Sequence, residues 1–103
     1  MSIVNTIANN SLTGIYAYTT LLNNTANNVA NMNTDGYKPL ETIMQESSSG
    51  GVNAVTTMSA NADNVDLSTE AVDMITAATG FKASISVLKT DQEMQKSIID
   101  LVV

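Results

Sequence analysis

Apolar residues recur every three or four positions along the first third of the chain. This spacing predicts one long helix over residues 2–34, roughly 45 Å long at about 1.5 Å per residue. Most of the remaining positions are Asn, Thr and Ser, which are poor helix formers, so we expect this helix to be weak alone and to need packing on more than one side. The heptad series comprises Met1, Val4, Ala8, Ser11, Ile15, Tyr18, Leu22, Thr25, Val29 and Met32.

A second heptad series predicts another long helix over residues 65–103. Asp66 or Ser68 is the expected N-cap, and Gly80 is an interior weak point that permits a close approach or a bend. Lys82, Lys89 and Lys96 repeat every seven residues. They form either a solvated face or a row of ion pairs with acids on a neighbouring subunit. The series comprises Leu67, Ala71, Met74, Ala78, Phe81, Ile85, Leu88, Gln92, Gln95, Ile99 and Val102.

The middle of the chain, residues 35–64, is the expected connection. Gly36 and Pro39 end the first helix. Two stretches rich in β-branched residues, 40–44 and 52–58, flank the Ser/Gly-rich residues 47–51, which favours a short β-hairpin. We therefore predict one domain of the mainly α class. Its two long heptad-patterned helices pack antiparallel and are joined by a short loop or β-hairpin region.

Charge and composition exclude several classes of function. The net charge is −6, there is no Arg among the four basic residues, and no charged residue precedes Asp35; we therefore expect no nucleic-acid partner. Without His or Cys, thiol catalysis and the usual zinc sites are ruled out, and no Ser or Thr has a His to activate it. We expect no enzyme activity, no cofactor and no metal. The chain lacks an unbroken apolar run of about 18 residues and a basic, apolar leader, so we expect neither membrane insertion nor a cleaved signal.

Two stretches resemble the signatures of a known family. Asn27-Asn28-Val29-Ala30-Asn31-Met32-Asn33-Thr34-Asp35-Gly36-Tyr37-Lys38 is similar to the N-terminal signature of the bacterial flagellar axial proteins, which form rod, hook and hook-associated structures. Asn64-Val65-Asp66-Leu67-Ser68-Thr69-Glu70-Ala71-Val72-Asp73-Met74-Ile75-Thr76-Ala77 resembles the C-terminal signature, continued by residues 89–94 and 98–102. Only about 25 residues separate the two, so the chain resembles a small proximal-rod subunit.

The resemblance implies a structural role. It implies a subunit of the basal-body rod, or of the rod/hook region, whose terminal helices self-assemble into an axial tube. Its partners would be other rod and hook subunits, further copies of itself and the flagellar type III export apparatus. It would be exported across the inner membrane to the extracytoplasmic axial structure of the basal body.

An alternative is a helical adaptor that binds axial subunits or the export machinery without polymerising. Two departures from the family pattern motivate it: the short middle, and the absence of the Gln-Arg that usually precedes the mid-helix aromatic residue, where this chain has Thr79-Gly80. The residues that we expect at subunit contacts are Ile15, Leu22, Asn27, Asn28, Val29, Asn31, Asn33, Gly36, Tyr37, Phe81, Ile85 and Leu88.

Overall fold

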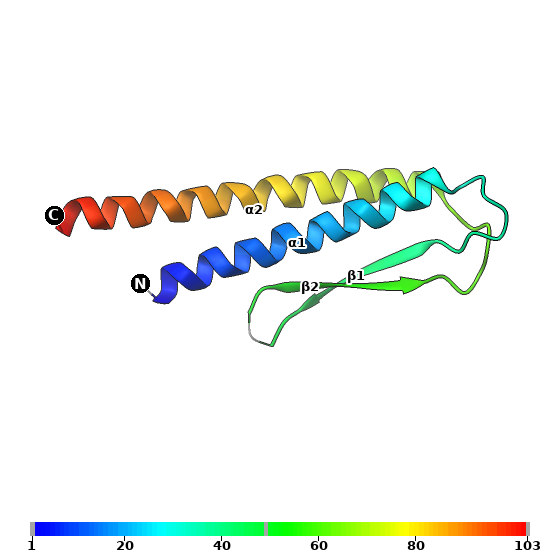
Figure 1. Ribbon diagram of the computed structural model, residues 1–103. Coiled ribbons are helices and arrows are strands. Elements are labelled where there is room, and N and C mark those ends of the chain that lie inside the picture. Colours follow the sequence, from blue (N-terminus) through cyan, green and yellow to red (C-terminus); the bar gives the residue numbers. More distant parts are fainter. Residues whose placement is uncertain (1, 49, 103) are drawn as a thin grey trace.

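A computed structural model describes the chain at residues 2–48 and 50–102, and its side chains at 7–48 and 50–101. It contains two helices and one hairpin, in the order α1 (Ser2–Ala30), β1 (Leu40–Glu46), β2 (Val52–Met58) and α2 (Leu67–Val102). Figure 1 shows a long, thin molecule with both termini at one end and the hairpin along α1. The predicted mainly α fold is confirmed. The predictions for Met1, Ser49 and the side chains of Val4 and Val102 fall outside the described residues.

Helix α1 ends at Ala30, four residues before the predicted boundary at residue 34. Tighter turns follow it, in which the Met32 N–H donates to the Val29 carbonyl and the Thr34 N–H to the Asn31 carbonyl. The Asn31 amide nitrogen also donates to the Asn27 carbonyl, at 2.9 Å. Side chains of this kind compete for the backbone groups that would extend a helix, which explains the early end.

The expected β-hairpin is present, and it packs against α1. Its strands pair antiparallel from Leu40 opposite Met58 to Glu46 opposite Val52. Gly50 and Gly51 have φ angles of 97° and 79°, which other residues rarely adopt. Asn24 of α1 fixes the hairpin by donating to the hydroxyls of Thr42, at 2.8 Å, and Thr56, at 2.9 Å. An isolated hairpin is marginal in water, so these α1 contacts position it.

Helix α2 begins after Asp66, one of the two predicted caps. Its Oδ1 accepts from the N–H groups of Ser68, at 3.0 Å, and Thr69, at 3.4 Å. By length and composition α2 passes a test for membrane-spanning helices, with a mean hydropathy of 1.2 over its best 18-residue window between Leu67 and Leu101. The prediction of no membrane insertion considered only unbroken apolar runs, and it overlooked this average. Only 6% of that window is buried, so α2 presents most of its apolar surface to the outside.

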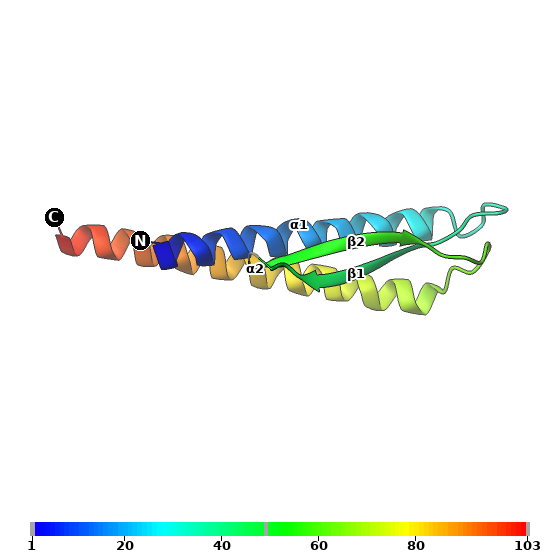
Figure 2. The same cartoon turned by 90° about the horizontal axis from the view of Figure 1, so that it is seen from below.

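Small and polar residues occupy much of the line of contact between α1 and α2. A Cβ atom on Gly14 would lie 2.7 Å from the Ser84 hydroxyl oxygen, and one on Gly80 would collide with the Tyr18 ring. Gly80 therefore permits a close approach, one of the two possibilities that the sequence left open. Both views show the helices side by side (Figures 1 and 2). The contacts run in opposite order along the two helices, from Gly14 with Ser84 to Asn28 with Glu70.

Many of the buried positions lie one residue before the predicted heptad position. On α2, Glu70, Ala77 and Asp91 are buried, whereas the predicted neighbours Ala71, Ala78 and Gln92 are exposed. On α1, Gly14, Leu21 and Asn28 are buried, whereas Leu22 is exposed and Ile15 and Val29 are half-buried. The predicted series followed the most apolar residues, but the helices approach through small and polar ones.

Very little apolar surface is buried within one copy of the chain. In the described part of the chain the buried apolar residues are Ala17, Leu21 and Ala77, and the largest fully buried side chains are those of Asn28, Thr25 and Asp91. Burial of apolar side chains is the main force that stabilises a fold. The helix pair thus has a thin core of its own and many apolar side chains left over.

Candidate subunit-packing surface

Asn28 lies at the centre of a buried hydrogen-bond cluster near the end of α1. Its amide nitrogen donates to the Leu40 carbonyl at 2.8 Å and to Glu70 Oε1 at 3.0 Å. Its amide oxygen accepts from the Leu40 N–H at 2.8 Å and from the Tyr37 hydroxyl at 2.6 Å. With 2% exposure, Asn28 therefore joins α1, β1 and α2 inside one chain. We call Asn28, Tyr37, Leu40 and Glu70 the clasp.

The other residues of the N-terminal signature surround the clasp. Asn27 donates to the Tyr37 hydroxyl at 2.9 Å. Gly36, whose φ of 76° suits a turn, donates its N–H to Asp63 Oδ1 at 2.9 Å, and the Asp63 N–H donates to the Tyr37 carbonyl at 2.7 Å. Asn33 is exposed. The polar groups of this signature are therefore used mostly within the chain, and their predicted role in subunit contacts stays a prediction.

The predicted apolar contact residues lie at or beside the line between the helices. Phe81 and Leu88 are half-buried on it, as are Ile15 and Val29 at its edge. Leu22 and Ile85 are 42% and 43% exposed. The structure thus brings Phe81 and Leu88 to the helix pair. It leaves the outer residues, Leu22 and Ile85, accessible to a neighbour.

The outer residues lie on the side of the helix pair away from the hairpin. Thr13 and Thr20 border the hairpin, and Ile15 and Leu22 each follow two residues later, about 200° further around α1. Val87 of α2 lines a cavity that the hairpin also lines, and Ile85 lies two residues before it. We call this surface the open face; it comprises Ile15, Leu22, Val29, Ala71, Ala78 and Ile85.

Two buried acids were not predicted. Burial raises the pKa of Glu70, against the lowering effect of its hydrogen bond from Asn28, while the charges of Asp73 and Asp66 add to the rise. Asp91 is 2% exposed, and its Oδ2 accepts from Gln95 at 3.2 Å. Both acids lie on the same helix face as Met74 and Ala77. This spacing could have placed them at the contact line, but charged residues are seldom buried, so the sequence argued against it.

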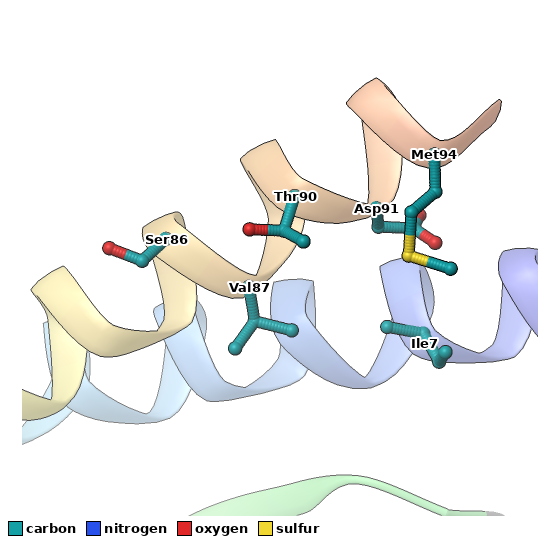
Figure 3. Close-up of a pocket in the computed structure, with 6 residues that line it drawn as sticks. All are labelled: Ile7, Ser86, Val87, Thr90, Asp91 and Met94. Atoms are coloured by element: carbon teal, nitrogen blue, oxygen red, sulfur yellow. The ribbon is translucent and has the colours of Figure 1, made fainter. Parts of the chain in front are cut away.

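A cavity of about 330 Å³ lies beside Asp91, near the start of α1. Figure 3 shows Met94 and Val87 of α2 pointing toward α1, where Ile7 faces Met94, while the Thr90 and Ser86 hydroxyls turn away. Asp91 Oδ1 has no hydrogen-bond partner among the described residues. The lining is otherwise largely apolar, so this end also offers apolar side chains for packing.

Two family models match the chain. The model described as "Flagellar basal body rod FlgEFG protein C-terminal" matches residues 59–101, which hold Glu70 of the clasp, all of the α2 part of the open face and nearly the whole of α2. The model described as "Flagella basal body rod protein" matches residues 20–38, which hold Asn28, Tyr37 and the end of α1. Comparison with curated proteins gives no match.

Proposed function

We propose that this chain, which belongs to the flagellar basal body rod protein family, is a structural subunit of the rod or rod/hook region that assembles through its two helices. We infer a role in packing rather than in catalysis. The building unit would be the α1–α2 pair in antiparallel arrangement, its contact lines following a heptad spacing. The opposite order of the contacts, from Gly14–Ser84 to Asn28–Glu70, supports this arrangement.

The observation that carries the proposal is the exposed apolar surface of so small a chain. Among the described residues, three apolar side chains form the buried core, whereas Leu22 and Ile85 of the open face, together with Val72 and Ile75 further around α2, are at least 42% exposed. Exposed apolar side chains in this number are typical of a protein that packs against partners. Neighbouring copies would cover them and supply the core that one copy lacks.

Protein rather than lipid is the proposed cover for α2. Asp73 and Lys82 lie along its apolar part, and a charged side chain is costly at the centre of a bilayer. Helix α1 and the clasp also cover one side of α2. A single helix that crosses a bilayer would instead be surrounded by lipid on all sides. We therefore propose packing among subunits and no membrane insertion.

The proposed partners are other rod and hook subunits and further copies of the chain, in the flagellar basal body. Delivery by the flagellar export apparatus would suit a helix pair with a thin core, because an unfolded chain passes a narrow channel more easily than a stable domain. A thin core also suggests that ordering is completed on assembly.

Sedimentation of the purified chain over a concentration series, with circular dichroism on the same samples, tests the proposal. A rod subunit should show helicity that rises with concentration into large or open-ended species. A helical monomer or closed dimer that is unchanged over the series would contradict self-assembly and favour the non-polymerising adaptor. In cells, a rod subunit should co-purify with basal bodies, and its deletion should abolish motility.

A charge on the open face makes the test specific. Ile85→Glu should prevent assembly, because the carboxylate would have to be buried in the contact. Helicity of the monomer should be unaffected, since Ile85 is 43% exposed within one copy. Ser48→Glu in the exposed hairpin turn adds the same charge and should leave assembly intact. Normal assembly of the Ile85→Glu chain would show that the open face is not an interface.

A further inference from the structure

We infer that an acidic cavity beside the clasp receives the lysine row of a second copy of this chain. The inference rests on the proposed self-assembly and specifies one of its contacts. The lysine row is Lys82, Lys89 and Lys96 on α2. The cavity lies between the first turns of α2, the start of β1 and the end of α1, on the hairpin side of the helix pair.

The cavity is polar and strongly acidic. It measures about 440 Å³ and is lined by Glu41 of β1 and by Asp66, Glu70 and Asp73 at the start of α2, with no basic side chain on its wall. Helix-end effects account for Asp66, which caps α2. They do not account for Glu70, which is buried, or for Glu41, which lines the same cavity from β1.

Glu70 carries the argument, because it is buried and only half satisfied. It is 7% exposed, and its Oε1 accepts from Asn28 at 3.0 Å. Its Oε2 has no hydrogen-bond partner among the described residues. A buried carboxylate oxygen without a donor is costly. A donor supplied from outside the chain, across the cavity that Glu70 lines, would remove that cost.

A basic side chain fits better than a metal ion. Within the described residues, no group of three or more carboxylates, His or Cys lies close enough together to hold a metal. An ammonium group needs only one or two carboxylates and reaches into a hollow on a flexible apolar stem. The acids of this cavity are therefore arranged for a lysine rather than for a coordinated cation.

The lysine row supplies such groups. Lys82, Lys89 and Lys96 are exposed, and they have no ion-pair partner in the described part of the chain. Seven residues, about two helical turns, separate consecutive lysines, and the same seven residues separate Asp66 from Asp73. Two lysines of one α2 therefore match two acids of another in spacing.

The two surfaces lie on opposite sides of α2. Nine residues, about two and a half turns, separate Asp73 from Lys82, which places them on opposite sides of the helix. One copy can thus offer its lysine row to a second copy while its own cavity accepts a third. Such a head-to-tail contact does not close on a two-fold axis, and it extends an assembly in one direction.

Charge reversal tests the contact. The cavity variant, Glu41→Lys with Asp73→Lys, changes the net charge from −6 to −2, since each substitution adds two positive charges. If only general repulsion between acidic chains mattered, this smaller net charge would improve assembly. We expect the opposite: the concentration needed for assembly should rise by a factor of roughly 30 or more. Asp35→Lys with Glu46→Lys makes the same charge change outside the cavity and should not raise it.

Complementation makes the result specific to the pair. The row variant, with Lys82, Lys89 and Lys96 all changed to Glu, should also fail to assemble alone. Because its reversed row matches the reversed cavity, an equal mixture of the row and cavity variants should recover assembly. Carbodiimide cross-linking of the mixed parent chains, one isotopically labelled, should join row lysines to cavity acids between copies.

The outcomes separate this contact from the proposed function. Assembly by the cavity variant at the parent's concentration, no recovery in the mixture, or cross-links that never join row to cavity would each overturn the contact while leaving a rod subunit in place. A parent chain that stays monomeric at every concentration would overturn self-assembly and this contact together. Assembly of the mixture, when neither variant assembles by itself, would support both self-assembly and this contact.

Discussion

Replacing Asn28 by Ala tests whether the clasp holds the two ends of the chain together. The substitution removes an amide that makes hydrogen bonds to Leu40, Tyr37 and Glu70 and leaves their polar groups without these partners. Asn28 is 2% exposed, so water does not readily take the place of the amide. We expect a large loss in the free energy of unfolding.

The size of the loss follows from the four hydrogen bonds. Three join neutral groups and contribute about 1 kcal/mol each, and the one to the Glu70 carboxylate contributes about 2 kcal/mol. Without relaxation the loss is about 5 kcal/mol. Rotation of the Tyr37 hydroxyl, which lies at the half-buried edge of the clasp, recovers part of it, so we expect about 3–4 kcal/mol. A domain of this size is stable by only about 5–15 kcal/mol in total.

Urea denaturation followed by circular dichroism measures this loss. All variants need the same protein concentration, because stability depends on concentration when folding and assembly are coupled. Asn23→Ala is the matched control: it makes the same substitution at an exposed position of the same helix, and it should change stability by no more than about 0.5 kcal/mol. A loss below about 1 kcal/mol in Asn28→Ala, or equal losses in both variants, would refute the structural role of the clasp.

Three further predictions concern the helix pair. Gly80→Ala should destabilise the chain because the new Cβ collides with the Tyr18 ring. In a Tyr18→Ala background the same substitution should instead stabilise the chain by about 1 kcal/mol, because Ala has the higher helix propensity. A stability change of the same sign in both backgrounds would contradict the contact. Because the pKa of folded Glu70 is raised, stability should fall as pH increases from the ordinary glutamate range through that raised pKa. In urea titrations Glu70→Gln should flatten this loss of stability with pH. An unchanged pH profile in that variant would show that Glu70 does not cause the loss. In flotation assays the parent chain should not rise with neutral lipid vesicles, and flotation that survives high salt would favour lipid as the cover of α2.

The elements were predictable because their local signals agree with the fold. The glycines at 50 and 51 take the positive φ angles of the hairpin turn, and Asp66 caps α2. Gly36 and Pro39 predicted the end of the first helix at residue 34, but α1 already ends at Ala30. The clasp was less predictable. Its Asn-rich signature was visible, but a buried hydrogen bond from Asn28 to Glu70 joins positions 42 residues apart. Nothing in the local pattern links these two side chains.

The displaced heptad series has a physical cause that bears on assembly. Periodicity finds the side of a helix where apolar residues are largest, and on α1 that side contains Ile15 and Leu22. In a monomeric protein this side would face the core. Here the two helices meet through Gly14, Ser84 and similarly small or polar residues, so that large apolar side chains fall just outside the contact. The proposed assembly gives this one-residue offset a role, because neighbouring copies would cover the large apolar side chains that one helix pair leaves outside its contact.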